Sequence, residues 1–166
     1  MGNDGARHLS PLFDRRPIKW DAKAGEYRVE LDDGLRQVLR ELMQQFLQML
    51  EDPDSPVLHR LFPPAYSNQS DLELQDEYRR LMQDDLVVRR REECEVVLTS
   101  VEARTVSEEQ LQAWSRAING IRLALGTYLD VKEEDPVVAP QTAEESAYQW
   151  LSYLLEETIG ALSRQT

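Results

Sequence analysis

A regular apolar pattern between residues 111 and 128 constrains the fold of this chain most. Its members follow one another at intervals of three or four residues: Leu111, Trp114, Ile118, Ile121, Leu125 and Tyr128. This spacing puts them on one face of an α-helix, and that face must be buried against another element. The pattern predicts a helix that starts with a capping pair at Ser107 and Gln110 and ends near Asp130.

Comparable patterns predict further helices on both sides of this one. The first covers about Asp33–Glu51, capped by Asp32 or Asp33. A second opens at Ser70, and Asp84-Asp85 either lies inside one long helix or starts a new one that ends near Ala103. The last begins at Thr142, with Glu145 as its capping partner. Residues 18–31 alternate around the turn at 21–25 and predict a short β-hairpin.

These elements predict an all-α fold, a single-domain bundle of four to five helices with a short N-terminal β-hairpin. We expect residues 1–17 to form a flexible N-terminal arm and residues 18–166 to form one helical domain. An apolar knot at Leu61–Tyr66 interrupts the helices, and it is a candidate contact for a homodimer.

Charge and composition exclude several classes of partner. The chain has 19 basic and 31 acidic residues, a net charge of −12, which argues against direct binding to nucleic acid or anionic lipid. No apolar run approaches the roughly 20 residues that span a bilayer, so no membrane segment is predicted. The polar N-terminus lacks the apolar core of a secretory signal, and we expect a cytoplasmic protein.

The residues that usually carry catalysis are scarce. The chain has one cysteine, Cys94, and two histidines, His8 and His59, which stand far apart. Neither histidine belongs to a metal-ligand spacing, and no glycine-rich phosphate loop is present. We therefore predict no metal, no cofactor and no enzymatic activity.

The sole basic concentration lies in the second predicted helix. It consists of Arg79, Arg80, Arg89, Arg90 and Arg91. One hypothesis makes this strip a binding surface for a partner or a phosphate. The spacing favours an alternative, a ladder of ion pairs four residues apart. Its members are Asp76–Arg80, Arg80–Asp84, Asp85–Arg89, Arg89–Glu93 and Arg91–Glu95.

A polar stripe runs beside the apolar face of residues 111–128. It contains Ser115, Asn119, Arg122 and Gly126, and glycine and asparagine are poor helix-interior residues. The stripe is either a partner-binding edge or a buried network. In a network, Arg122 would meet a carboxylate, for which we predict Asp84 or Asp85, and Gly126 would let two helices approach closely.

Cys94 lies on the apolar side of its helix. A reactive thiol would need a lowered pKa, which Arg90 and Arg91 favour and Glu93 and Glu95 oppose. The pattern favours a buried, inert thiol.

Several of these residues occur in an order that resembles a known family. The order is Leu61–Tyr66, Glu77–Leu81, Asp84–Leu86, Trp114, Ile118–Gly126 and Tyr148–Leu151. It is similar to an actinobacterial family filed as domain of unknown function two-thousand-seventeen, over about Ile18–Leu162. The resemblance implies an all-helical cytosolic protein without established catalysis. Some members, of the AosR type, are described as oxidative-stress regulators that act with a sigma factor at the transcription machinery.

The chain departs from that type in its cysteines. The redox-sensing mechanism of the family invokes two cysteines in one chain, and here only Cys94 exists. Sensing would require an intermolecular disulfide or a sulfenic acid at Cys94, and a buried thiol argues against both.

We therefore predict a regulatory protein-interaction module that docks through Arg79–Arg91 and Asn119–Gly126. The resemblance implies a sigma factor or RNA polymerase as the partner. One alternative is an accessory factor of the cytosolic protease and its adaptor ClpS, because the resemblance implies that family members are often encoded beside ClpS. A direct DNA binder is another.

Overall fold

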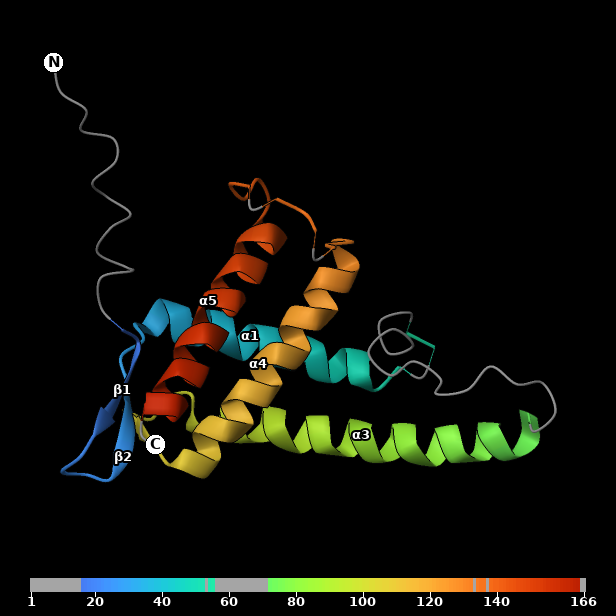
Figure 1. Cartoon of the computed structure of the whole chain (residues 1–166), viewed down its shortest axis with the longest axis horizontal. Helices are drawn as coiled ribbons and strands as arrows, with labels where there is room; N and C mark the ends of the chain where they lie inside the picture. The colour runs from blue at the N-terminus through green and yellow to red at the C-terminus, as the bar shows by residue number, and fades with distance from the viewer. Residues whose placement is uncertain (1–15, 53, 56–71, 133, 137, 165–166) are drawn as a thin grey trace, which may run out of the picture.

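The computed structural model describes residues 16–52, 54–55, 72–132, 134–136 and 138–164. Within these ranges, four helices pack beside a three-stranded antiparallel sheet (Figure 1). The helices are α1 (Asp33–Leu50), α3 (Leu72–Ser100), α4 (Glu108–Tyr128) and α5 (Ala143–Arg164). The strands are β1 (Ile18–Asp21), β2 (Glu26–Val29) and β3 (Thr105–Val106). The predicted helical fold with an N-terminal hairpin is confirmed, and β3 is an addition to it.

Some predictions fall on residues outside these ranges. They concern most of the N-terminal arm, the apolar knot at Leu61–Tyr66, the Ser70 cap and both histidines. Pro17, the last residue assigned to the arm, is buried, and its carbonyl accepts a hydrogen bond from the Glu30 amide at 2.7 Å.

Three predicted helix starts are confirmed by their caps. The Asp32 carboxylate accepts from the Leu35 amide at 2.8 Å. Ser107 and Gln110 form a reciprocal capping box, and the Thr142 hydroxyl accepts from the Glu145 amide at 3.1 Å. Each cap satisfies an amide that the first helical turn leaves without a partner.

Helix α3 is one continuous element that contains Asp84-Asp85, which decides between the two predicted alternatives. Its 29 residues make a rod of about 43 Å. Its N-terminal turns extend beyond α4 and α5 (Figure 1), and they expose Leu81 and Met82. The helix ends at Ser100, earlier than predicted, because the chain turns there toward β3.

The sheet lies at one end of the helical body, beside the start of α1 and the C-terminal turns of α5 (Figure 1). In β1 and β2, Ile18 pairs with Val29, and Trp20 pairs with Tyr27. The short β3 adds to β2 by pairing Val106 with Tyr27. Ile18, Tyr27, Val29 and Val106 are buried, so the sheet turns one apolar face to the helices. The loop between β1 and β2 closes at Gly25, whose φ of +67° suits glycine.

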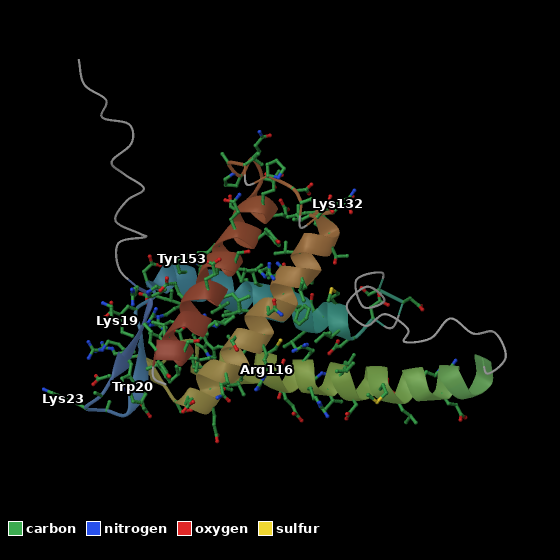
Figure 2. All side chains as sticks on the ribbon, in the orientation of Figure 1. Lys19, Trp20, Lys23, Arg116, Lys132 and Tyr153 are labelled. Atoms are coloured by element: carbon green, nitrogen blue, oxygen red, sulfur yellow. The ribbon has the colours of Figure 1, made fainter. Side chains whose placement is uncertain are left out.

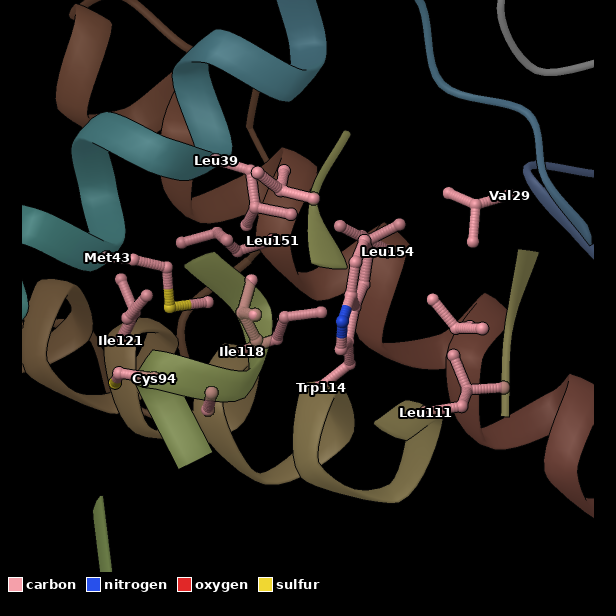
Figure 3. Packing of buried hydrophobic residues seen from close by; sticks show 14 of the residues in the cluster. Val29, Leu39, Met43, Cys94, Leu111, Trp114, Ile118, Ile121, Leu151 and Leu154 are labelled. Atoms are coloured by element: carbon pink, nitrogen blue, oxygen red, sulfur yellow. The ribbon is translucent and has the colours of Figure 1, made fainter. Parts of the chain in front are cut away.

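The core lies where α4 meets its neighbours. Figure 3 shows Trp114, Ile118 and Ile121 of α4 between side chains of α1 and α5. Trp114 is fully buried, and its Nε1 donates a hydrogen bond to the Ser100 hydroxyl at 2.8 Å. The predicted face of α4 is thus confirmed, except that Tyr128, in the last turn, is 74% exposed.

A buried arginine that the sequence did not predict ties three segments together. Arg36 of α1 is 7% exposed. Its guanidinium donates to four backbone carbonyls: those of Val29, Leu31, Val101 and Ala103. It therefore links α1 to the end of β2 and to the turn after α3.

Among the residues that the structure describes, every helix is too short or too polar to cross a lipid bilayer.

Candidate functional site

The predicted arginine strip lies along α3 and borders a groove between α3 and α4. Arg80, Arg89 and Arg91 are exposed and Arg90 is half-buried, while the side chain of Arg79 lies outside the described part. The groove has a volume of about 570 Å³. Its apolar lining comes from Leu86, Val96 and Ala113; its charged lining comes from Arg89, Arg90, Glu92, Glu93 and Arg116.

The predicted ion-pair ladder forms only in part. Arg89 pairs with Asp85 at 3.3 Å, as predicted. Glu93 pairs with Arg90 at 2.8 Å instead of with Arg89. Arg80 and Arg91 form no ion pair with another described residue, although Asp84 and Glu95 stand four residues away. The Arg89–Asp85 pair is exposed, and such pairs contribute only a few tenths of a kcal/mol, whereas the Arg90–Glu93 pair is partly buried.

Arg116 completes the rim of the groove from the other side. It projects from the outer face of α4, where α4 crosses α3 (Figure 2). It is exposed and has no ion pair with any described residue. Arg116 belongs to no basic cluster in the sequence, so no pattern indicated it, and only the packing of the two helices brings it to Arg89 and Arg90.

The predicted polar stripe of α4 lies against α5. Arg122 Nη1 donates to the Tyr148 hydroxyl at 3.4 Å, and Nη2 donates to Asn119 Oδ1 at 3.3 Å. The guanidinium carbon also lies 5.9 Å from the centre of the Tyr148 ring. We call Asn119, Arg122, Gly126 and Tyr148 the α4–α5 joint.

Gly126 sets the position of the tyrosine. A Cβ atom at Gly126 would lie 3.1 Å from Tyr148 Cε2, which is closer than ordinary packing allows. The ring therefore occupies space that a glycine leaves open. This agrees with the prediction that Gly126 permits the close approach of two helices.

The prediction that Arg122 pairs with Asp84 or Asp85 is wrong. Asp85 pairs with Arg89 on the exposed side of α3, and Asp84 is exposed as well. Arg122 instead turns toward α5, where its partners are a neutral amide and a neutral hydroxyl. Its Nε is buried and has no hydrogen-bond partner among the described residues.

The strip and the joint lie on different sides of α4. Gly120 faces Phe46 of α1 and Arg90 of α3, whereas Gly126 faces α5. The docking hypothesis grouped Arg79–Arg91 with Asn119–Gly126. The structure places these two sets of residues on two separate surfaces.

Cys94 is fully buried in the core, as predicted. Burial, together with the charges of Glu93 and Glu95, raises the pKa of its thiol to about 12, although Arg90 acts in the opposite direction. The thiolate that reacts with oxidants is therefore absent at neutral pH. In the described part of the chain, no group of three or more His, Cys, Asp or Glu side chains gathers to hold a metal ion.

Comparisons with known proteins place the chain in a family. A family model described as "Domain of unknown function (DUF2017)" matches residues 15–162. The chain belongs to this family.

One curated relative adds a functional description. Over 129 residues, the chain is 28% identical to the protein named "Putative oxidative stress regulator AosR" from Mycobacterium leprae (strain TN). The match covers 66% of this chain and 59% of the relative, so it spans less than two thirds of that protein's length. No solved structure matches the chain significantly. A regulatory role fits this distant relative.

Proposed function

We propose that this DUF2017 protein is a non-enzymatic regulator of the oxidative-stress response. It acts by binding a protein of the transcription machinery, a sigma factor or a subunit of RNA polymerase. The name of the relative supports the stress response, and the resemblance described above supports the transcription machinery as its target.

The observation that carries this proposal is the groove between α3 and α4. Its floor is apolar, with Leu86 and Val96 half-buried along α3. Arg89 and Arg116 stand exposed at its rim. An apolar floor with arginines at the rim is a common composition of protein interfaces, in which arginine is enriched. A partner helix with an apolar stripe, carboxylates opposite Arg89 and Arg116 and a basic residue opposite Glu92 would complement the groove.

The burial of Cys94 affects how such a regulator responds to oxidants. Since its thiol is inaccessible and protonated, oxidation at Cys94 does not switch the surface. We therefore expect the redox state of the partner, and not that of this chain, to decide when the two proteins bind.

Affinity capture from lysate, with and without peroxide, tests the proposal. The test variant is Arg89→Glu combined with Arg116→Glu, which reverses the charge of the rim. The matched control is Arg104→Glu, because Arg104 is exposed just before β3, away from the groove. We expect the wild type and the control to recover polymerase or sigma subunits, and the double variant to lose them.

Binding of the purified subunit then gives the magnitude. The double reversal should raise the dissociation constant at least tenfold, which is a loss of about 1.4 kcal/mol in binding free energy. Recovery of protease subunits alone, or equal binding by the test and control variants, would contradict the proposal. Loss of the partner after nuclease treatment would point to DNA as the bridge.

A further inference from the structure

The α4–α5 joint holds a cation without a counter-ion. Arg122 is half-buried, and its hydrogen-bond partners, Asn119 and Tyr148, are both neutral. Within the described residues it contacts no carboxylate. A guanidinium removed from water is normally paired with an anion, because the desolvation cost is otherwise uncompensated.

The unused hydrogen-bonding capacity of the joint consists of donors. Asn119 Oδ1 and the Tyr148 oxygen both accept from Arg122, and no described residue accepts from the Asn119 NH₂ group or the Tyr148 O–H, which can therefore donate. Each terminal nitrogen of Arg122 has two N–H groups, and one partner is assigned to each nitrogen. In this cluster the acceptors are bonded to Arg122 and the remaining hydrogen-bonding groups are donors, so the cluster is suited to bind an anion.

We propose that Arg122, Asn119 and Tyr148 form a binding site for a carboxylate. The planar fork of a guanidinium matches the two oxygens of a carboxylate, which it can bind through two parallel hydrogen bonds. The net charge of −12 on the chain also disfavours anions of higher charge. Gly126 contributes by fixing the Tyr148 ring, and therefore its hydroxyl, beside Arg122.

This inference goes beyond the proposed function and does not depend on it, because the joint and the groove lie on different sides of α4. The carboxylate belongs either to a free organic acid or to a glutamate or aspartate side chain of a protein. Both present the same group to Arg122, so the experiment includes a probe for each.

Thermal unfolding with sodium acetate, at an ionic strength held constant with sodium chloride, is the first test. A ligand present at ten times its dissociation constant should raise the Tm by about 3–5 °C. We expect this shift for the wild type and for Arg104→Gln, and no shift for Arg122→Gln. A shift of equal size in Arg122→Gln, or no shift in the wild type, would overturn the site.

Two further measurements keep the test decisive if Arg122→Gln folds poorly. Tyr148→Phe keeps the ring against Gly126 and removes one donor, and we expect it to reduce the acetate shift. In the wild type, acetate should move the NMR signal of the Arg122 Nε–H, which a purely structural arginine would not show. An unchanged signal would overturn the proposal.

The remaining measurements identify which class of anion binds and whether it comes from a free acid or from a protein. Because sulfate and phosphate stabilise folded proteins in general, each shift is taken as the difference between the wild type and Arg122→Gln. This difference should be smaller with sodium sulfate and sodium phosphate than with acetate at the same ionic strength, and a larger difference would overturn the assignment to a carboxylate. A blocked peptide with one glutamate tests a protein source. Tighter binding of the peptide than of acetate assigns the site to a protein side chain, and tighter binding of acetate assigns it to a free acid. Both results support a carboxylate site.

Discussion

A buried arginine and a half-buried one behave differently in this molecule. Arg36 lies where α1 meets the sheet and the end of α3. It donates to four backbone carbonyls, so its guanidinium needs no carboxylate partner. Arg122, where α4 meets α5, makes two bonds of 3.3 and 3.4 Å to neutral side chains and keeps a buried Nε without a partner.

The difference lies in what surrounds each cation. Backbone carbonyls come from the ends of β2 and α3, where regular pairing stops and acceptors are left over. Along the middle of two packed helices, the carbonyls are already used, so Arg122 meets only side chains. A guanidinium at element ends therefore becomes a structural cross-link, and one between helices retains the capacity to bind something else.

Replacing each arginine with methionine should separate the two roles most clearly. Arg36→Met leaves several buried carbonyls unpaired, and we expect a loss of about 4 kcal/mol in the free energy of unfolding. Arg122→Met keeps the aliphatic volume and removes only long bonds, so its loss should stay below about 1 kcal/mol. Urea unfolding of both variants, with Arg104→Met as the control, measures the difference. Equal losses would remove the distinction.

The thiol of Cys94, in the C-terminal half of α3, tests how closed the core is. Burial raises its pKa to about 12, whereas the thiol of an unfolded chain ionises near pH 8.5. Between these values the unfolded state binds fewer protons than the folded state, so stability falls as the pH rises. Relative to Cys94→Ala, the wild type should lose about 1–2 kcal/mol between pH 8.5 and 10.

The use of Cys94→Ala as the reference removes the contributions of Tyr27 and Tyr153. Burial raises the pKa of both phenols, and they titrate equally in the two proteins. A difference in stability that does not change with pH would mean that the thiol is open to solvent.

The smallest expected effect concerns the packing of the joint. Gly126→Ala should gain helix propensity, about 1 kcal/mol, but in the wild type the new Cβ presses on the Tyr148 ring. In a Tyr148→Ala background the same change should give the full gain. A double-mutant cycle measured by urea unfolding should therefore show a coupling of about 1 kcal/mol. Strict additivity would mean that Gly126 does not position the ring.

Features set by neighbours in sequence could be predicted. The caps at Asp32, Ser107 and Thr142 depend on residues three positions apart, and the buried face of α4 depends on its period. The burial of Cys94 followed from the same period. The predicted residues of the joint also share a surface, because i, i+3 and i+7 positions on a helix always do.

Features set by distant segments could not be predicted. The partner of Arg122 depends on which helix lies beside α4, and periodicity does not specify the order of helices. Arg36 binds carbonyls, which any residue supplies, so no pattern of residue types indicates its partners. The two residues of β3 are too few to show alternation, and Arg116 joins the groove only through the crossing of α3 and α4.

The passage from β3 into α4 contains no spare residue. Val106 pairs with Tyr27 in the sheet, Ser107 caps the helix, and Glu108 is its first residue. One inserted residue here would turn α4 by about 100° relative to the sheet. Trp114 would leave the core, and Arg122 would no longer face α5. This junction therefore fixes the rotation of α4 about its own axis. A strand of two residues decides which side of α4 faces the core and which side faces α5.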